Sequence, residues 1–213
     1  MNLRSKDSPE NIVLSLTKRI QALSQSGLTY STCEYDLERY EELREISIKL
    51  MSMISPFNVE MIRDLFASET GYQTPKVDIR AVVIKENRIL MVRERNDGLW
   101  SLPGGWADIG VSPGENAKKE VKEETGLDVV PKKVLAILDK ECHEHPPSIH
   151  HTYKIFILCE IISGKLKTGL ETDAVDFFPE NNLPELSVNR NTQSQILMMF
   201  DLKNSSIMET VFD

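Results

Sequence analysis

Three glutamates at helical spacing form the most informative chemical pattern in this sequence. Glu120, Glu123 and Glu124 lie in the run AKKEVKEETG, residues 117–126, and positions i, i+3 and i+4 are neighbours on a helix surface. Like charges at that spacing destabilise a helix by roughly 0.2–0.5 kcal/mol per pair. One interpretation is a solvated charged face. The other is a site for a hard divalent cation, because a metal bound by oxygen atoms removes the repulsion between clustered carboxylates.

The flanking residues predict where this acidic helix begins and ends. Ser112-Pro113-Gly114-Glu115 fits the capping box S-x-x-E with proline at the first helical position. Gly126 supplies a left-handed stop. Ala117 and Val121 are four residues apart and are expected to face the core.

A loop with two glycines precedes the helix. Leu102-Pro103-Gly104-Gly105 follows a predicted strand, and glycine permits close backbone approach and dihedral angles that other residues avoid. Such a loop is able to direct a backbone carbonyl towards the metal that the glutamates would hold.

The loop and the acidic helix must be positioned by the strand-like segments around them. VDIRAVVI (77–84) and RILMVRE (88–94) are rich in Val, Ile and Leu and are joined by the short turn KEN, a pattern typical of partly buried strands. Further elements are expected downstream: strands at 129–140, 153–162 and 174–178, and a closing helix at 191–200. Strands on both sides of a central helix imply a mixed α/β domain.

The N-terminal third predicts helices. Ser8-Pro9 places an N-cap before a proline, and Gly27 is expected to end the first helix. Ser31-Thr32-Cys33-Glu34 fits a capping box that opens a longer helix, and Asn58 is a cap for a third. The apolar residues at helical spacing are Val13, Leu16, Ile20 and Leu23, then Leu37, Tyr40, Leu43, Ile46, Leu50 and Ile54 before Pro56, then Ile62, Leu65 and Phe66.

These helices allow two functional interpretations. Residues 1–70 hold 8 Lys and Arg against 11 Asp and Glu, a net charge of −3, whereas a helical module that reads DNA normally carries a basic face. A packing or dimerisation domain that also covers part of an active site is therefore preferred over a DNA-binding module. Residues 68–76 are rich in turn residues and form a linker, so the predicted domains are 1–70 and 75–213.

The composition limits the partners and the compartment. The 213 residues carry a net charge of −8, so the chain as a whole does not attract nucleic acid or anionic membrane. Three scattered cysteines form no disulfide framework and suit a reducing compartment. The N-terminal residues do not fit a signal peptide, and the longest apolar stretch, YKIFILC, is far shorter than a membrane span. A cytoplasmic protein is expected.

The stretch from Gly105 to Leu127 resembles the Nudix box, G-x5-E-x7-R-E-U-x-E-E-x-G-U with U apolar. The matching positions are Gly105, Glu120, Val121, Glu123, Glu124, Gly126 and Leu127. The helical leader, with GLTY and FxxxxGYQTPKVDIRA, is most similar to the Nudix subgroup with an N-terminal helical domain, which includes CDP-choline and ADP-ribose pyrophosphatases. The resemblance implies an α+β Nudix fold, an α/β/α sandwich with a mixed sheet, preceded by a small all-α domain.

Two positions depart from the box. Val111 stands where the family has its first Glu, and Lys119 stands where it has Arg. In the family these two residues support each other and help to orient the acids that bind metal, so Lys119 is expected to act behind the metal ligands. The departure leaves the acids intact and affects the rigidity around them, hence the rate or the metal affinity. Glu115 is explained by its cap and by an expected ion pair with Lys119, four residues later.

The resemblance implies hydrolysis of a nucleoside diphosphate linked to another group, NDP-X, to a nucleoside monophosphate and phospho-X. Mg²⁺ or Mn²⁺ neutralises the pyrophosphate and lowers the pKa of a bound water. The implied ligands are Glu120, Glu124, the adjacent Glu123 and, by resemblance, the Gly105 carbonyl. A general base is also needed. Glu171 matches best, as base or as a further metal ligand, although it is alternatively a surface-loop acid; Glu120 is the other candidate base.

Other residues are candidates for substrate contact. Asp78 and Arg80 share one face of a strand, so Arg80 either contacts a phosphate or a base, or forms a salt bridge with Asp78. Trp106 and Trp100 flank the PGG loop and present flat faces for stacking a nucleobase, although core packing suits Trp100 equally. All four histidines lie in KECHEHPPSIHHTY. Their spacing does not match a zinc site, which leaves a flexible substrate-side loop, in which His150 would meet a phosphate, or an exposed loop.

Two other functions remain open. One is a nucleoside triphosphate or RNA-end hydrolase, which would release phosphate or pyrophosphate. The other is a regulator that senses a ligand with the same fold and without the chemistry; retention of Glu120 and Glu124 argues against it. The expected partners are a small nucleotide and, by resemblance, a second copy of the chain in a homodimer, without DNA or membrane.

Overall fold

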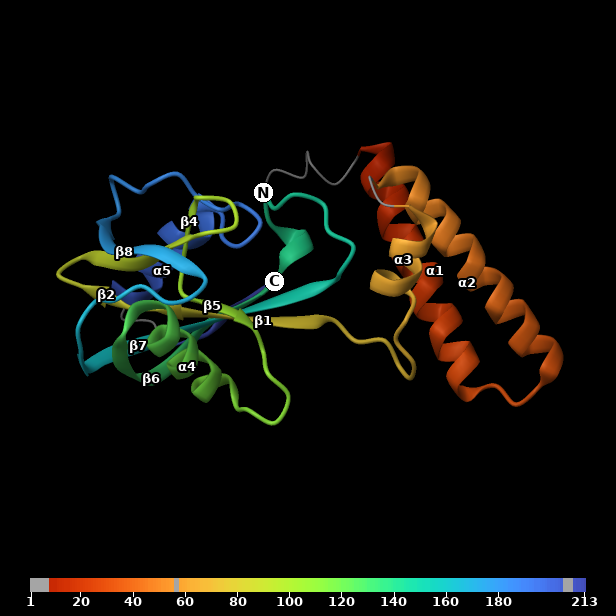
Figure 1. The fold of residues 1–213 in the computed structure, drawn as a ribbon, viewed down its shortest axis with the longest axis horizontal. Coiled ribbons are helices and arrows are strands. Elements are labelled where there is room, and N and C mark those ends of the chain that lie inside the picture. Colours follow the sequence, from red (N-terminus) through yellow and green to blue (C-terminus); the bar gives the residue numbers. More distant parts are fainter. Residues whose placement is uncertain (1–7, 56–57, 205–208) are drawn as a thin grey trace. The chain divides into compact units, whose positions relative to one another are not determined.

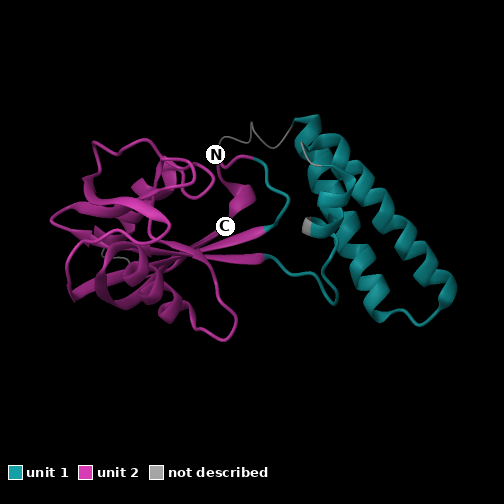
Figure 2. Cartoon of the chain, viewed as in Figure 1, with its two compact units in different colours: residues 1–75, 147–151 teal, residues 76–146, 152–213 magenta. Residues whose placement is uncertain are grey.

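The computed structural model describes residues 8–55, 58–204 and 209–213, apart from the side chain of Leu65. The chain forms two compact units, residues 1–75 with 147–151, and residues 76–146 with 152–213 (Figure 2). Within the described ranges, no helix has the length and apolar character that crossing a membrane requires.

The first unit is built from α1 (Pro9–Tyr30), α2 (Glu34–Ile54) and α3 (Val59–Phe66) (Figure 1). Two of the predicted caps are confirmed, because the Ser8 hydroxyl accepts the Asn11 N–H at 3.2 Å and the Asn58 side chain accepts the Met61 N–H at 2.9 Å. The predicted capping box at the start of α2 is wrong, since the N-cap is Cys33 and makes no side-chain cap bond. The predicted stop at Pro56 lies outside the described residues.

Gly27 does not end α1, which continues to Tyr30. A Cβ atom at Gly27 would lie 2.4 Å from ring atoms of Tyr40. The glycine therefore permits close packing of α1 against α2, and the prediction of a helix stop there is wrong.

The contact between α1 and α2 is largely polar. The residues that α1 buries are Thr17, Gln21, Ser24 and Gln25. The Ser47 hydroxyl of α2 donates to the Gln21 side chain at 3.0 Å. Leu16 and Leu23, from the predicted apolar stripe, are 58% and 49% exposed. Val13 and Ile20 of the same stripe are half-buried, so the stripe is left partly uncovered within one chain. The buried apolar cluster of the unit consists of Ile48, Met51, Ile62, Phe66 and Ala67.

The second unit contains a mixed five-stranded sheet in the order β5-β1-β7-β6-β9. Its strands are β1 (Lys76–Val82), β5 (Gly104–Trp106), β6 (Leu127–Asp139), β7 (Thr152–Gly164) and β9 (Val211–Phe212). β1 runs parallel to β7 and antiparallel to β5. A second sheet holds β2 (Ile84–Lys85), β3 (Arg88–Glu94), β4 (Trp100–Ser101) and β8 (Thr172–Pro179). The predicted turn between β2 and β3 has Glu86 and Asn87 at φ of 50° and 55°.

The five-stranded sheet packs helices on opposite faces. On one face, Ile79 of β1 belongs to the apolar cluster that holds Val121 of α4 (Pro113–Thr125). On the other face, Phe156 of β7 belongs to the cluster that holds Phe200 of α5 (Gln193–Asn204). A short 3₁₀ turn, η1 (Lys140–Cys142), follows β6. The expected α/β/α arrangement preceded by helices is confirmed.

Candidate active site

The acidic helix α4 begins and ends as its sequence predicts. Both bonds of the capping box are present between Ser112 and Glu115, and Gly126 closes the helix with φ of 74°. Ala117 and Val121 are fully buried. Glu124, seven residues after Ala117, lies on the same helix face as these two residues and is buried, whereas Glu120 beside it is half-buried and Glu123 is exposed.

Gly104 brings the backbone of that loop onto Glu124. The Glu124 side chain is 7% exposed, and its carboxylate accepts the Gly104 N–H at 3.0 Å. Gly104 has φ of +139°, and a Cβ atom there would lie 2.0 Å from the Ile79 carbonyl oxygen. Only glycine fits this position. The next residue, Gly105, lies beside Glu120, whose carboxylate is 3.8 Å from the position that a Gly105 Cβ would occupy.

Burial and mutual repulsion make the carboxylates of α4 reluctant to ionise. Burial raises the pKa of Glu124 to about 8; nearby Glu120 and Glu94 add to the increase, while Arg80 opposes it. Burial also raises the pKa of Glu120, with Lys119 opposing and Glu123 contributing. A cation bound among these acids would relieve the repulsion that contributes to the raised pKa values of Glu120 and Glu124.

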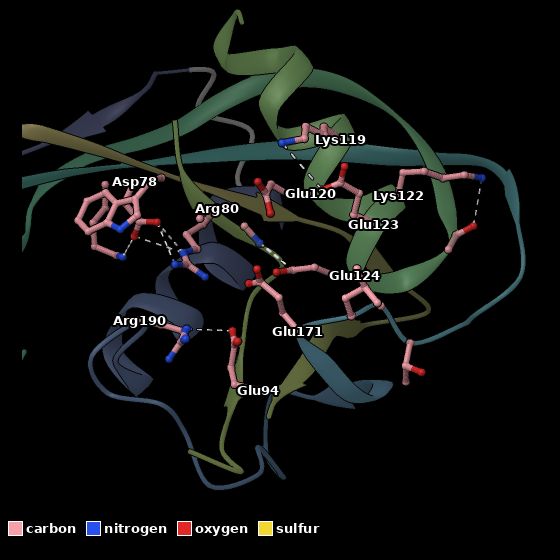
Figure 3. Close-up of a pocket in the computed structure, with 18 of the residues that line it drawn as sticks. Asp78, Arg80, Glu94, Lys119, Glu120, Lys122, Glu123, Glu124, Glu171 and Arg190 are labelled. Carbon is pink, nitrogen blue, oxygen red and sulfur yellow. Dashed lines mark hydrogen bonds and ion pairs between the residues drawn. The ribbon is translucent and has the colours of Figure 1, made fainter. Parts of the chain in front are cut away.

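A cavity of about 1220 Å³ opens at these acids (Figure 3). The predicted site residues that line it are Asp78, Arg80, Gly105, Trp106, Lys119, Glu120, Glu123, Glu124 and Glu171. His150 does not line it and belongs to the segment 147–151 of the helical unit. A contact between His150 and a phosphate therefore stays a prediction.

Glu171 reaches the cavity because its loop is pinned to the end of α4. A Cβ atom at Gly169 would lie 2.3 Å from the Glu123 carbonyl oxygen, and the Thr172 hydroxyl donates to the Glu124 carbonyl at 3.1 Å. The Glu171 carbonyl accepts the Arg95 N–H at 2.9 Å. The Glu171 side chain is exposed and lies near Glu124 in the cavity (Figure 3).

Lys119 takes a partner that the sequence did not suggest. Its ammonium lies 2.6 Å from the Asp108 carboxylate and 3.9 Å from that of Glu123. The expected Glu115–Lys119 pair is wrong, because the Glu115 carboxylate is occupied by the hydroxyl and N–H of Ser112. The Asp108 N–H also donates to buried Asn116 of α4 at 3.0 Å. The loop before α4 is thus tied to the helix at two points.

Replacing Asp108 with Asn is expected to weaken divalent-cation binding up to about fivefold, because half-exposed ion pairs contribute up to roughly 1 kcal/mol. The ion pair between Asp108 and Lys119 restrains the helix that carries the acids. Titration with Mn²⁺ by calorimetry measures the effect. Asp128→Asn is the matched control, since Asp128 pairs with Lys122 of the same helix at 2.8 Å. Equal effects in both variants would show that Asp108 has no specific role.

Asp78 and Arg80 form the salt bridge that was one of the two interpretations. Three contacts join them, because the Arg80 Nε lies 3.0 Å from one Asp78 oxygen and 3.2 Å from the other, and an Arg80 Nη lies 2.9 Å from the first. Arg80 also donates to the Leu102 carbonyl at 3.0 Å. Trp100 packs in the core edge-on to Phe178, with ring centroids 4.6 Å apart. Trp106 is 56% exposed and lines the cavity, so the stacking of a nucleobase on it stays a prediction.

Sequence reasoning missed several charged residues of the cavity wall, among them Glu94, Lys154 and Arg190. Glu94 is 4% exposed, accepts the Ser101 hydroxyl at 2.7 Å and pairs with Arg190 at 2.9 Å. Lys154 is 1% exposed and bonds to Asp78. A lysine inside the apolar run YKIFILC was the available signal for Lys154, whereas the pairing of Glu94 with Arg190 joins distant segments and left no local pattern.

The histidine-rich segment makes ordinary structural contacts. His143 lies 3.1 Å from the Asp213 carboxylate. The His145 ring lies 2.6 Å from the Val188 carbonyl oxygen and 3.1 Å from the Gln195 side chain, and burial lowers the pKa of His145 to about 4. These contacts hold the segment 143–145 against its own unit.

The donor set of the cavity fits a hard divalent cation. Carboxylates and a backbone carbonyl are the ligands that Mg²⁺ and Mn²⁺ prefer. In the part of the chain that the structure describes, no three His, Cys, Asp or Glu side chains are already arranged around one ion. Mg²⁺ usually binds through one or two carboxylates together with water and substrate phosphates, which suits an open set of this kind.

Two family models match the chain. Residues 11–66 match a model described as a UDP-X-like, N-terminal oligomerisation domain, and residues 74–199 match the NUDIX domain. The second match alone covers more than half of the 213 residues.

Relatives of known name match over long stretches. A Bacillus subtilis protein named "Putative ADP-ribose pyrophosphatase YjhB" is 50% identical over 200 residues, 94% of this chain and 96% of its own length. An ADP-ribose pyrophosphatase of Methanocaldococcus jannaschii is 34% identical over 119 residues, 54% of this chain and 69% of its own length.

Solved structures show the same architecture. A structure named as a UDP-X diphosphatase is 28% identical and superimposes with a TM-score of 0.63, covering 96% of this chain and 99% of its own. An ADP-ribose pyrophosphatase of Streptococcus suis is 46% identical with a TM-score of 0.61, covering 66% of this chain and 100% of its own.

Proposed function

Because this chain belongs to the Nudix family and is a pyrophosphatase of the NDP-X hydrolase type, we propose that it hydrolyses ADP-ribose or CDP-choline to a nucleoside monophosphate and a phosphorylated X in the presence of Mg²⁺ or Mn²⁺. The observation that carries the proposal is the cavity in which Glu120, Glu123 and Glu124 lie together with Arg80 and Lys154. Hydrolysis of a pyrophosphate requires carboxylates that bind the metal ion and positively charged side chains that bind the phosphate oxygens.

Each residue has a role in the proposed reaction. Glu120, Glu123, Glu124 and the Gly105 carbonyl would hold the metal, which when bound neutralises phosphate charge and lowers the pKa of a coordinated water. Glu171 accepts the proton of the attacking water, with Glu120 as the alternative base. One P–O bond forms to the water oxygen, the anhydride P–O bond breaks, and the leaving phosphate departs with its oxygen.

The recognition residues complete the proposed site. Arg80, oriented by Asp78, donates to the phosphates, and the exposed face of Trp106 stacks with the nucleobase. Lys119 acts on the acids of α4 through its contacts with Asp108 and Glu123. A contact of His150 with a phosphate stays a prediction from the sequence.

The test is a panel of ADP-ribose, CDP-choline, UDP-glucose and ATP, each with Mg²⁺, Mn²⁺ or EDTA, with products identified by mass in ¹⁸O water. Monophosphate and phospho-X products that disappear with EDTA would support the proposal. Release of phosphate or pyrophosphate from ATP alone would favour a triphosphatase. Absence of turnover across the panel, with intact fold, would favour a ligand-binding regulator.

We also propose that residues 1–70 join two chains into a homodimer. The helical stretch matches a model described as an oligomerisation domain. Leu16 and Leu23 of α1 and Met53 of α2 are exposed by 58%, 49% and 80% within one chain, and large apolar side chains gathered on helices are typical of interaction surfaces. Residues 75–213 are the catalytic domain in this proposal.

The double variant Leu16→Glu, Leu23→Glu is expected to halve the molecular mass in light scattering after size-exclusion chromatography, because buried charges without partners destabilise an interface. Ser15→Glu is the control, since Ser15 is exposed on the same helix. A dimer that persists in the double variant would show that α1 does not form the interface.

We propose a cytoplasmic location from the state of the cysteines. Cys33, Cys142 and Cys159 all lie in the described residues, and none of them forms a disulfide bond. Cysteines without disulfide bonds suit a reducing environment.

A further inference from the structure

Two buried cations share one carboxylate in the wall of the cavity. Asp78 of β1 and Lys154 of β7 are direct neighbours in the parallel pairing of these strands, and Arg80 lies two residues further along the same face of β1. Asp78 and Arg80 are each 5% exposed, and Lys154 is 1% exposed. Lys154 donates a hydrogen bond to one carboxylate oxygen of Asp78, and Arg80 donates to both carboxylate oxygens.

The charges of this group do not cancel. One carboxylate and two cations give a net charge of +1, at a depth where charges are screened weakly. Asp78 is held ionised, because Arg80 and Lys154 outweigh the effect of burial and lower its pKa. Burial lowers the pKa of Lys154 to about 8, opposed by Asp78, so the ammonium stays mostly charged at neutral pH. Glu124 and Glu94 act on Arg80 from the same cavity and offset part of this charge; an anion that entered the cavity would offset more of it.

The group also retains hydrogen-bond donors. All three guanidinium nitrogens of Arg80 have partners in Asp78 or Leu102, which leaves N–H groups on the two Nη atoms, because a guanidinium carries five. Lys154 has three N–H groups, and its bond goes to Asp78. Because Asp78 accepts from both cations, its part is to position them.

A buried hydroxyl beside this group lacks a partner. Thr152 lies two residues before Lys154 on the same face of β7, is 2% exposed and lines the cavity. Among the described residues, its hydroxyl finds no hydrogen-bond partner. A water or a ligand that enters the cavity would supply the partner that this hydroxyl lacks.

We propose that Arg80, Lys154 and Thr152, positioned by Asp78, form a subsite for phosphoryl oxygens that binds pyrophosphate without metal. This proposal rests on the proposed function and extends it. Lys154 cancels the charge of Asp78 and leaves the charge of Arg80 for the substrate. Without Lys154, the pair of Asp78 and Arg80 would be neutral and would attract phosphate weakly.

Calorimetry with inorganic pyrophosphate and with ADP-ribose in EDTA tests the subsite. Lys154→Met is expected to weaken both affinities about tenfold to a hundredfold, as for a lost hydrogen bond to a charged group. Lys154→Arg should retain most of the affinity. The double variant Asp78→Asn, Lys154→Met restores a net charge of +1 and should recover part of it, which a merely structural role of Lys154 does not predict. Lys167→Met is the control, because Lys167 is an exposed lysine of the same cavity.

Thr152→Val keeps the shape of the side chain and is expected to weaken pyrophosphate binding a few-fold. If Lys154→Met does not fold, Thr152→Val tests the subsite in its place. The inference is overturned if the wild type binds no pyrophosphate in EDTA, or if Lys154→Met and Thr152→Val bind it as the wild type does, whatever the panel of substrates shows. If the panel fails while these affinities change as expected, the phosphate subsite stands and the proposed reaction falls.

Discussion

Glu124→Gln is expected to lower the kcat for NDP-X hydrolysis by about 100-fold or more. Loss of a residue that only supports a metal ligand typically costs 10- to 100-fold, and Glu124 is proposed as a ligand itself. Its carboxylate is also fixed by the Gly104 N–H at 3.0 Å, so the change removes an ordered group. Steady-state kinetics at saturating Mg²⁺ and Mn²⁺ measure the effect.

The same variant should remain folded, which separates loss of chemistry from loss of structure. The raised pKa of Glu124, about 8 against 4.5, means that the metal-free folded state holds more protons than the unfolded state between these values. Stability of the wild type therefore falls as pH rises through this window, and Gln removes that penalty. Melting temperatures at pH 6 and pH 8 without metal should show a smaller decrease in Glu124→Gln.

Glu160→Gln is the matched control for these measurements. Glu160 pairs with Lys132 at 2.9 Å, with its side chain 65% exposed, and does not line the cavity. It should leave both the kcat and the pH dependence unchanged. Wild-type turnover in Glu124→Gln would refute the assignment of the metal face.

Gly104→Ala is expected to reduce the free energy of unfolding by about 2–4 kcal/mol more than Gly98→Ala does. Both glycines have positive φ, +139° and +71°, but a Cβ atom at Gly98 meets nothing within 4 Å, whereas one at Gly104 would lie 2.0 Å from the Ile79 carbonyl oxygen. The difference between the variants therefore contains the steric clash at residue 104 together with the extra strain of a φ of +139°, which lies further from the left-handed well than +71° does. Urea denaturation measures both.

The turnover of the two variants Gly104→Ala and Gly98→Ala gives a second measurement. Displacing the backbone at residue 104 moves the N–H that fixes Glu124, so Gly104→Ala should lose turnover even where it remains folded. Gly98→Ala should keep it. Equal stability and equal turnover in the two variants would show that the loop can relax away from β1 without cost.

The acidic helix could be read from the sequence because its determinants are local. Its capping box, its glycine stop and its buried Ala117 and Val121 all lie within the helix or next to it. The spacing of Glu120, Glu123 and Glu124 on one surface follows from 3.6 residues per turn. The long strands β1, β3, β6 and β7 were equally local, since runs of Val, Ile and Leu mark them, whereas the short strands β4, β5 and β9 carry no such run and were not predicted.

In the helical unit, the local sequence pattern did not predict which residues are buried. Leu16 and Leu23 have the spacing of a core stripe, yet α1 buries Gln21 and Thr17 against its neighbour. Helical spacing shows which residues share a face, but it does not show whether that face is covered by the same chain. Gly27 is similar, because its contact with Tyr40 on α2 decides its role.

By itself, the sequence determined the family resemblance, the acidic helix and the glycines beside it. The box that carries most of this signal runs over 23 residues from Gly105 to Leu127, with Gly104 directly before it. Only the tertiary structure decided that Lys119 pairs with Asp108, that Arg190 pairs with Glu94, and that Lys154 shares Asp78 with Arg80. The physical reason is that hydrogen-bond and charge partners are chosen by distance in space. Strand pairing brings residues 78 and 154 together, and no periodicity along the chain records that neighbourhood.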